Sequence, residues 1–171
     1  MSAAPPDTIV AIATPSGTGG IGVLRISGAE AFNIGSTITA SQVVPGRIQF
    51  RKFYDANGEA IDHGLCLAFQ APRSFSGEDS VELQAHGGPI VLDMLLERVC
   101  QLGARLARAG EFSERAFLNG RLDLAQAEAI ADLIESGSRA ASRAAMRSLE
   151  GRFSQQIHRI VDEIIEVRAY I

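Results

Sequence analysis

The sequence has few of the residues from which disulfide frameworks and metal centres are built. Its 171 residues include two cysteines, three histidines and no tryptophan, and 6% are aromatic. Cys66 and Cys100 do not form a CxxC pair, no two histidines have metal-ligand spacing, and there is no HExxH. This pattern excludes a disulfide-rich secreted domain and is typical of a reducing cytoplasm. We therefore expect neither a zinc site nor metal catalysis.

Long apolar runs and an excess of basic charge are also missing. No run approaches the roughly 18–20 apolar residues of a membrane span, and the first residues, MSAAPPDT, lack the basic and apolar regions of a signal peptide. Lysine and arginine number 16 against 20 acidic residues, which excludes a general polyanion binder. We expect a soluble, cytoplasmic protein with no membrane association.

The first two-thirds of the chain indicate strands and turns. Short β-branched runs alternate with glycine and proline, as in a sheet. Helices are expected over 29–38 and 89–103, the second because Pro89 opens it and Gly103 follows its apolar residues. Asn57 and Gly58 indicate a turn over 55–61. Strands are expected over 8–13, 21–27, 47–54, 64–70 and 81–87.

The last third is helical. The pattern predicts a helix over 111–120, with Phe112 on its apolar side and Asn-Gly as its C-cap. A second helix is expected over 124–135, capped by Asp123, and one long helix, capped by Ser138, runs to Ile171. Gly151 lies inside this last run, where a glycine costs about 1 kcal/mol, and the helix would be roughly 50 Å long. Its apolar positions are Ala141, Ala145, Leu149, Phe153, Ile157, Ile160, Ile164, Val167 and Ile171.

The fold class expected from these patterns is α+β. A mixed-sheet domain over 1–118 is followed, over 119–171, by the first helices of an all-α domain. The last helix has no glycine, asparagine or proline stop. We therefore expect the chain to be a piece of a larger protein.

A glycine-rich loop follows the first predicted strand. Gly17, Gly19 and Gly22 spell GxGxxG, but a strand-like segment follows where a dinucleotide site needs a helix. The loop also lacks the Lys-Ser/Thr of a Walker motif. We expect a tight connection between strands; the alternative is a loop that lets a ligand approach backbone N–H groups.

Two charged residues interrupt apolar strands. Arg25 lies in VLRIS and Glu82 in SVELQ. A charge there either faces solvent on an alternating strand, which is the commoner case, or contacts a ligand. If both contact a ligand, Arg25 would pair with a carboxylate and Glu82 would accept hydrogen bonds from a guanidine-like, pterin-like edge.

The remaining polar motifs favour structural roles. His86 precedes two glycines at an expected strand-to-helix turn, and His63 is expected in a surface turn. Glu78 and Asp79 could form an acid/base pair, but adjacent acids more often cap turns. A basic line recurs every four residues on the last helix, where a solvated face supported by neighbouring acids is favoured over phosphate binding; its members are Arg139, Arg143 and Arg147.

Three long motif blocks carry a resemblance to a known family. TIVAIATPSGTGGIGVLRISG, SFSGEDSVELQAHGGPIVLD and GEFSERAFLNGRLDLAQAEAIADLI resemble the N-terminal part of the MnmE (TrmE) family of tRNA uridine-modifying GTPases. The resemblance covers the chain from Asp7 onward. It implies a domain similar to the tetrahydrofolate-binding domain of aminomethyltransferases.

The resemblance also implies a set of ligand contacts. The family's contacts to 5-formyl- or 5,10-methylene-tetrahydrofolate fall on Arg25, Glu82 and Arg121. Arg121 stands where lysine is usual, which keeps the charge and changes the donor geometry. Ser16 and Thr18 stand where many relatives have proline and arginine, and AHGG replaces CHGG or GHGG, so side-chain roles for the glycine loop are in question.

The family's activity implies further partners. Its members form a homodimer through the N-terminal domain and act with a flavin-dependent partner, MnmG (GidA). Together they add an aminomethyl-type group to carbon 5 of the wobble uridine of tRNA. GTP, Mg²⁺ and K⁺ belong to a GTPase domain that these 171 residues lack, so we expect no catalytic residue here. The alternatives are a non-catalytic dimerisation module with a decayed folate site and an independent aminomethyltransferase-like enzyme.

Overall fold

The structure is a computed structural model that describes residues 7–169, except for the side chains of His158, Val167 and Ala169. The chain forms two compact units, Met1–Phe112 and Ser113–Ile171. The predicted boundary after residue 118 lies at the end of helix α3 (Glu111–Leu118), which begins in the first unit.

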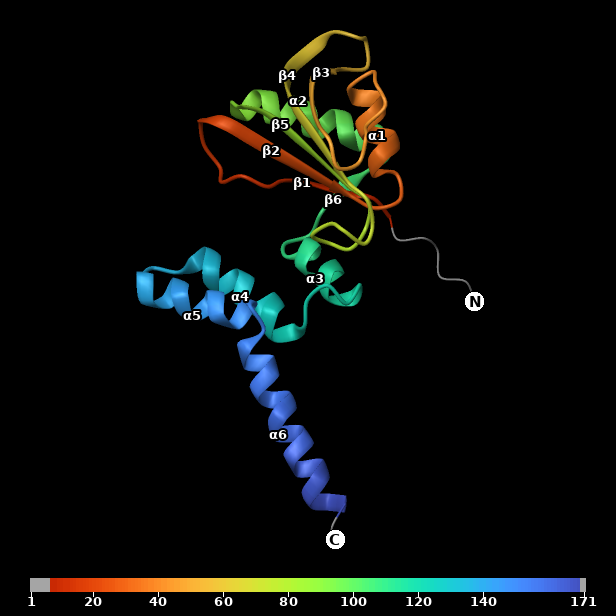
Figure 1. The fold of residues 1–171 in the computed structure, drawn as a ribbon. Helices are drawn as coiled ribbons and strands as arrows, with labels where there is room; N and C mark the ends of the chain where they lie inside the picture. Colours follow the sequence, from red (N-terminus) through yellow and green to blue (C-terminus); the bar gives the residue numbers. More distant parts are fainter. Residues whose placement is uncertain (1–6, 170–171) are drawn as a thin grey trace. The chain divides into compact units, whose positions relative to one another are not determined.

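The first unit is built on a mixed six-stranded sheet, as the sequence predicts (Figure 1). The strand order is β3-β4-β5-β2-β1-β6, and every neighbouring pair is antiparallel except β1 and β6. Five strands were expected; the sixth, β6, has only two residues and was missed because so short a run has no readable periodicity. The strands are β1 (Ile9–Ile12), β2 (Gly19–Ser27), β3 (Ile48–Tyr54), β4 (Ala60–Phe69), β5 (Ser80–Gly87) and β6 (Arg105–Leu106).

Two helices, α1 (Ala31–Ile38) and α2 (Pro89–Gln101), cover one face of the sheet. Helix α2 has its proline at the first turn, and Gly103 lies beyond its end with a φ of +106°. Leu92, Leu95 and Val99, which share one side of α2, are buried against inward-facing strand residues. Burying each such side chain contributes about 1.5–3 kcal/mol. This core fixes which strand residues face the helices and which face away.

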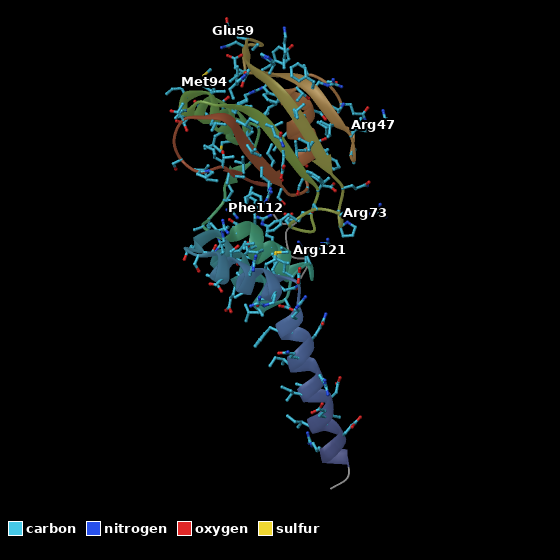
Figure 2. The ribbon with its side chains drawn as sticks, turned by 60° about the vertical axis from the view of Figure 1, so that its left-hand side comes forward. Arg47, Glu59, Arg73, Met94, Phe112 and Arg121 are labelled. Atoms are coloured by element: carbon cyan, nitrogen blue, oxygen red, sulfur yellow. The ribbon has the colours of Figure 1, made fainter. Side chains whose placement is uncertain are left out.

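The β3–β4 hairpin is tighter than the sequence suggested. The Asp55 carboxylate accepts hydrogen bonds from the backbone N–H groups of Asn57 (2.9 Å) and Glu59 (2.8 Å), so the turn closes before Ala60. The predicted turn is confirmed, but it ends at Glu59 and not at 61, and β4 starts at Ala60 and not at 64, because the Asx-type bonds let pairing begin earlier. Figure 2 shows Glu59 at this hairpin tip and Met94 on α2.

The second unit contains α4 (Leu124–Glu135), α5 (Arg139–Leu149) and α6 (Arg152–Ala169). The predicted caps are confirmed. Asp123 accepts a hydrogen bond from the Gln126 N–H (2.8 Å), and the Gln126 side chain accepts one from the Asp123 N–H (2.9 Å). Ser138 accepts a bond from the Ala141 N–H (3.1 Å). Such caps satisfy N–H groups that the helix leaves unpaired.

The prediction of a single long helix from Ser138 was wrong. Residues Glu150 and Gly151 separate α5 from α6, and Gly151 has a φ of +80°. The Gln126 side chain also donates a hydrogen bond to the Leu149 carbonyl (2.9 Å), which is one of the groups left free where α5 ends. The apolar spacing continues across the break, and for that reason the periodicity did not reveal it. Ile171 and the Val167 side chain lie outside the described residues.

No helix between residues 7 and 169 is both long and apolar enough to cross a lipid bilayer.

Replacing Gly151 by alanine tests the break. Because a left-handed φ disfavours residues with a Cβ, Gly151→Ala should destabilise the protein by about 1 kcal/mol. In one continuous helix the same change would stabilise it by about 1 kcal/mol. Urea denaturation distinguishes the signs. The matched control is Gly137→Ala, because Gly137 has no positive φ and no atom near its missing Cβ.

Candidate functional site

Arg25 and Glu82 form an ion pair on the face of the sheet away from α1 and α2. They are register partners on β2 and β5, and the residues that flank Arg25, Leu24 and Ile26, are fully buried in the core. The Nε and Nη2 atoms of Arg25 each lie 2.8 Å from Oε1 of Glu82. Side-chain exposure is 29% for Arg25 and 17% for Glu82. The pair is thus partly desolvated, where charge-assisted bonds are stronger than in water.

Two aromatic rings lie against the Arg25 guanidinium. Its Cζ atom is 5.1 Å from the centroid of Phe75 and 5.8 Å from that of Phe112. Both distances are within the range of cation–π attraction. Phe75 comes from the loop between β4 and β5, and Phe112 is the second residue of α3 (labelled in Figure 2). The guanidinium therefore has a defined orientation.

The contacts of these two rings with Arg25 are not predicted by the sequence. Phe112 was placed on the apolar side of its helix, and Phe75 was not singled out. The available signal was an aromatic residue inside the polar loop SFSGEDS, where an apolar ring has no core to join. Their contact with Arg25 depends on tertiary structure and has no local pattern.

The ion pair leaves hydrogen-bonding capacity unused. Both Arg25 donors reach the same oxygen, and within residues 7–169 neither Nη1 of Arg25 nor Oε2 of Glu82 has a hydrogen bond. Arg25 and Glu82 were expected to contact different parts of a ligand. The structure pairs the two side chains into one polar edge, which leaves one donor of Arg25 and one acceptor oxygen of Glu82 without a hydrogen bond. These two groups can bind a ligand that offers an acceptor and an N–H donor.

The third predicted contact, Arg121, belongs to the second compact unit. It follows α3, its side chain is exposed, and its backbone N–H donates to the Ala116 carbonyl (2.8 Å). The asparagine and glycine before it end α3 as expected, with Gly120 at a φ of +66°. A ligand contact by Arg121 stays a prediction.

The glycine loop connects two antiparallel strands, β1 and β2, as the sequence favoured. Gly17 has a φ of +122°. The loop lines a hollow of about 250 Å³ together with Gly87 and Leu92. Because a strand follows the loop, no helix N-terminus is placed to bind a pyrophosphate, in agreement with the tight connection between strands that the sequence favours.

Asp62 and His86 form a second polar pair on neighbouring strands. The Asp62 carboxylate accepts hydrogen bonds from the His86 N–H (2.8 Å) and from its Nδ1 (2.9 Å). Burial raises the pKa of Asp62, but the hydrogen bonds from His86 and His63 outweigh it and leave the pKa below its usual value. His63 lies on β4, not in the expected turn, with its ring 5.6 Å from that of His86.

These two histidines border a separate hollow of about 230 Å³, lined also by Phe50, Leu65 and Gln84. Among the described residues, no group of three or more histidine, cysteine, aspartate or glutamate side chains is placed to hold a metal ion. Sequence spacing did not reveal the pair of histidines because they meet only through the pairing of β4 with β5.

The other polar candidates have structural roles. Glu78 accepts a hydrogen bond from the Ser27 hydroxyl (2.7 Å), and Asp79 accepts one from the Ala71 N–H (2.8 Å), as expected of residues that organise a turn. Burial raises the pKa of the Cys66 thiol to about 11 and also raises that of Cys100. Neither is a reactive thiolate at neutral pH.

The basic line on α5 is exposed, as predicted, but the neighbouring acids do not support it. Within the part of the chain that the structure describes, none of its members forms an ion pair; they are Arg139, Arg143 and Arg147.

A mixed sheet with helices on one face and a polar edge on the other, followed by an all-helical unit, defines an α+β protein with an added helical domain. Comparison with known families agrees. The profile described as the GTP-binding protein TrmE N-terminus matches residues 8–121, and the chain belongs to this family. The profile of the MnmE helical domain matches residues 124–171. The resemblance seen in the motifs is thereby confirmed.

Curated relatives match nearly all of the chain. The tRNA modification GTPase MnmE of Methylococcus capsulatus is 56% identical over 171 residues, which are 100% of this chain and 38% of the relative. The protein of the same name from Chromohalobacter salexigens is 53% identical over 165 residues, and that from Pseudomonas entomophila 54%; each match covers 96% of this chain and 36% of the relative. The chain thus spans little more than a third of these relatives.

The Asp62–His86 pair gives a prediction on pH. Asp62→Asn should lower stability at pH 7 by about 1–3 kcal/mol, because a charged acceptor becomes neutral. The pKa of Asp62 is lower in the folded state than in the unfolded state, where it is about 3.9. The ionised carboxylate therefore stabilises the protein at pH values above about 3.9, and this contribution is lost as the pH falls through the folded-state pKa. The difference between variant and wild type should therefore shrink below about pH 4. Denaturation at several pH values measures it, with the exposed Asp93→Asn as control.

Proposed function

We propose that the chain is the folate-binding and dimerising part of a tRNA-modifying GTPase. The observation that carries the proposal is the polar edge of Arg25 and Glu82, held against two aromatic rings. Membership of the TrmE N-terminal family supports it. The cofactor would be 5-formyl- or 5,10-methylene-tetrahydrofolate.

The residues present fit such a cofactor. A pterin ring carries N–H donors beside acceptor atoms, and the free Oε2 of Glu82 and Nη1 of Arg25 complement them. Phe75 is 39% exposed beside the guanidinium and offers a ring on which a flat heterocycle can stack. Arg121 would add a positive charge for an anionic or carbonyl group. When bound, tetrahydrofolate would supply the one-carbon unit, and these residues would orient it.

Dimerisation would use the sheet face away from α1 and α2. By the register of β3 with β4, Ile48 and Phe50 lie on that face, with exposures of 70% and 63%. Ile21 borders the same hollow as Phe50 and is 67% exposed. Exposed apolar groups of this size are typical of an interaction surface. A second copy of this chain is the proposed occupant.

GTP hydrolysis and tRNA modification would depend on the part of a full-length protein that lies outside these 171 residues. The 171 residues contain no Walker motif, so GTP hydrolysis with its Mg²⁺ and K⁺ would occur elsewhere in a full-length protein. In such a protein, tRNA is the proposed substrate and a flavin-dependent protein of the MnmG type the proposed partner. The product would be a wobble uridine with an aminomethyl-type group on carbon 5.

One observation favours a second candidate, a dimerisation module that no longer binds folate. In this structure Arg25 and Glu82 satisfy part of each other's hydrogen-bonding capacity. A pair that is already formed gains less from a ligand than two free groups would. Dimer formation by the wild-type chain without folate binding would support this candidate.

Isothermal titration with 5-formyl-tetrahydrofolate tests the proposal. We expect binding by the wild-type chain, weakened about 10- to 100-fold by Arg25→Ala or Glu82→Ala, because each removes hydrogen bonds to a charged group. Arg47→Ala is the matched control, since this exposed arginine lies outside the site. Analytical ultracentrifugation of the same samples reports the oligomeric state. Equal affinity in wild type and both site variants would contradict the assignment.

A further inference from the structure

The orientation of Arg25 depends on two aromatic rings that lie outside the β-strands. Phe75 and Phe112 come from a loop and from the start of a helix, segments that can move more easily than the sheet. Each ring, however, has neighbours in sequence that belong to a polar network.

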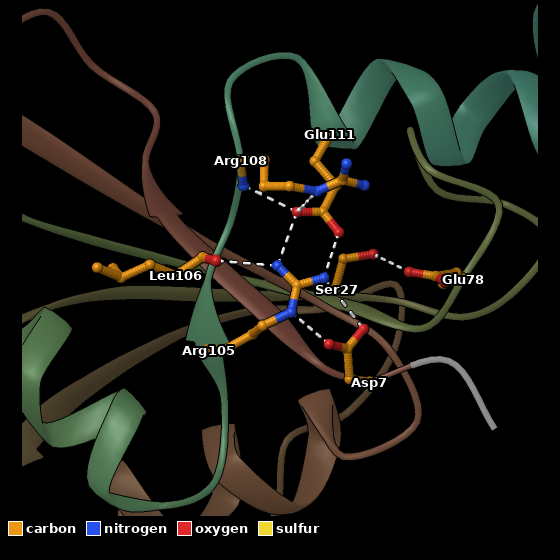
Figure 3. Close-up of polar contacts among 7 residues, drawn as sticks. All are labelled: Asp7, Ser27, Glu78, Arg105, Leu106, Arg108 and Glu111. Carbon is orange, nitrogen blue, oxygen red and sulfur yellow. Dashed lines mark hydrogen bonds and ion pairs between the residues drawn. The ribbon is translucent and has the colours of Figure 1, made fainter. Parts of the chain in front are cut away.

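On the side of Phe112, the holding group is a buried carboxylate. Glu111, the preceding residue, is only 2% exposed. It accepts hydrogen bonds from Nη1 (2.8 Å) and Nη2 (2.5 Å) of Arg105 and from the Arg108 N–H (2.8 Å). Arg105 also pairs with Asp7, so one guanidinium joins the N-terminal segment to the start of α3 (Figure 3).

On the side of Phe75, the holding groups are serines. The hydroxyl of Ser27, a fully buried residue on β2, lies 2.6 Å from that of Ser76 and donates to Glu78 (2.7 Å). Ser74 donates to the Glu78 carbonyl (2.5 Å). Phe75 therefore lies between two anchored serines. Ser27 is two residues from Arg25 on the same strand, so it points to the same face of the sheet.

A charge in the position of Glu111 is costly unless its partners are well aligned. Two bonds from one planar guanidinium and one from a backbone N–H provide that alignment and fix the first turn of α3 in a single geometry. The backbone of Phe112 belongs to that turn, so the position from which its ring extends is set by the same bonds. The bonds of the buried Glu111 carboxylate to the partly exposed Arg105 thus help determine where the second ring meets Arg25.

We propose that Glu111, through its bonds with Arg105, is a positioning residue for the Arg25–Glu82 site. It holds Phe112 against the guanidinium and so keeps Arg25 in the orientation in which it pairs with Glu82. Its effect on a ligand rests on the proposed function. Its effect on Arg25 is a property of the ligand-free chain and can be measured alone.

NMR of the ligand-free, ¹⁵N-labelled chain tests the positioning. The Arg25 Nε–H proton lies near two rings and donates to Glu82, so its signal depends on ring position. We expect Glu111→Gln to move this signal in the same direction as Phe112→Leu. Glu97→Gln, a change at an exposed carboxylate on α2, should leave it in place. An unmoved signal in Glu111→Gln, with a moved one in Phe112→Leu, would overturn the proposal.

Arg105→Lys protects the test against misfolding of the first variant. It keeps the positive charge but cannot form the two-bond fork with Glu111. If the fork positions Phe112, the Arg25 signal should move as in Glu111→Gln. An unmoved signal in a folded Arg105→Lys variant would contradict that role of the fork.

Titration with 5-formyl-tetrahydrofolate tests the consequence for binding. Because a pre-organised site loses less conformational freedom, Glu111→Gln and Arg105→Lys should each weaken binding about tenfold, with Glu97→Gln unchanged. A moved Arg25 signal with unchanged affinity would overturn the link between positioning and binding. Absence of binding by the wild type would contradict the proposed function, while the NMR result would still decide the role of Glu111.

Discussion

The candidate site depends on one cross-strand interaction, the ion pair between Arg25 and Glu82. It places two charged groups on neighbouring strands where the flanking residues are buried in the core. The pairing of β2 with β5 fixes their separation, and the rings of Phe75 and Phe112 limit how Arg25 can turn. The sheet thus fixes the position of the ion pair. The β4–β5 loop and the first turn of α3, which carry the two rings, fix the orientation of the Arg25 side chain.

The two faces of the sheet differ in polarity, and this difference explains why such a site is stable. One face is covered by α1 and α2 and contains the apolar core. The other carries alternate strand positions, where charged, aromatic and imidazole groups are tolerated because they do not interrupt that core. Both polar pairs, Arg25 with Glu82 and Asp62 with His86, join adjacent strands. A change of register by one residue would bury Arg25 and Glu82 in the core.

Much of the fold could be predicted from the sequence, because hydrophobic periodicity and caps are local signals. The helix over Pro89–Gln101 and the caps at Asp123 and Ser138 are examples. The break at Gly151 could not, since the apolar spacing continues across it. Within the site, Arg25 and Glu82 stood out as charges in apolar strands. Their pairing, the two rings and the buried Glu111 depend on contacts distant in sequence, which leave no periodic pattern.

If Arg25 and Glu82 act as one unit, a double-mutant cycle on folding stability should show that the effect of changing one residue depends on the other. Urea denaturation of Arg25→Met, Glu82→Gln and the double variant gives their coupling energy. Because the pair is partly exposed, we expect a favourable coupling of about 1 kcal/mol. Effects that add to within about 0.3 kcal/mol would contradict the account, since independent residues behave in that way.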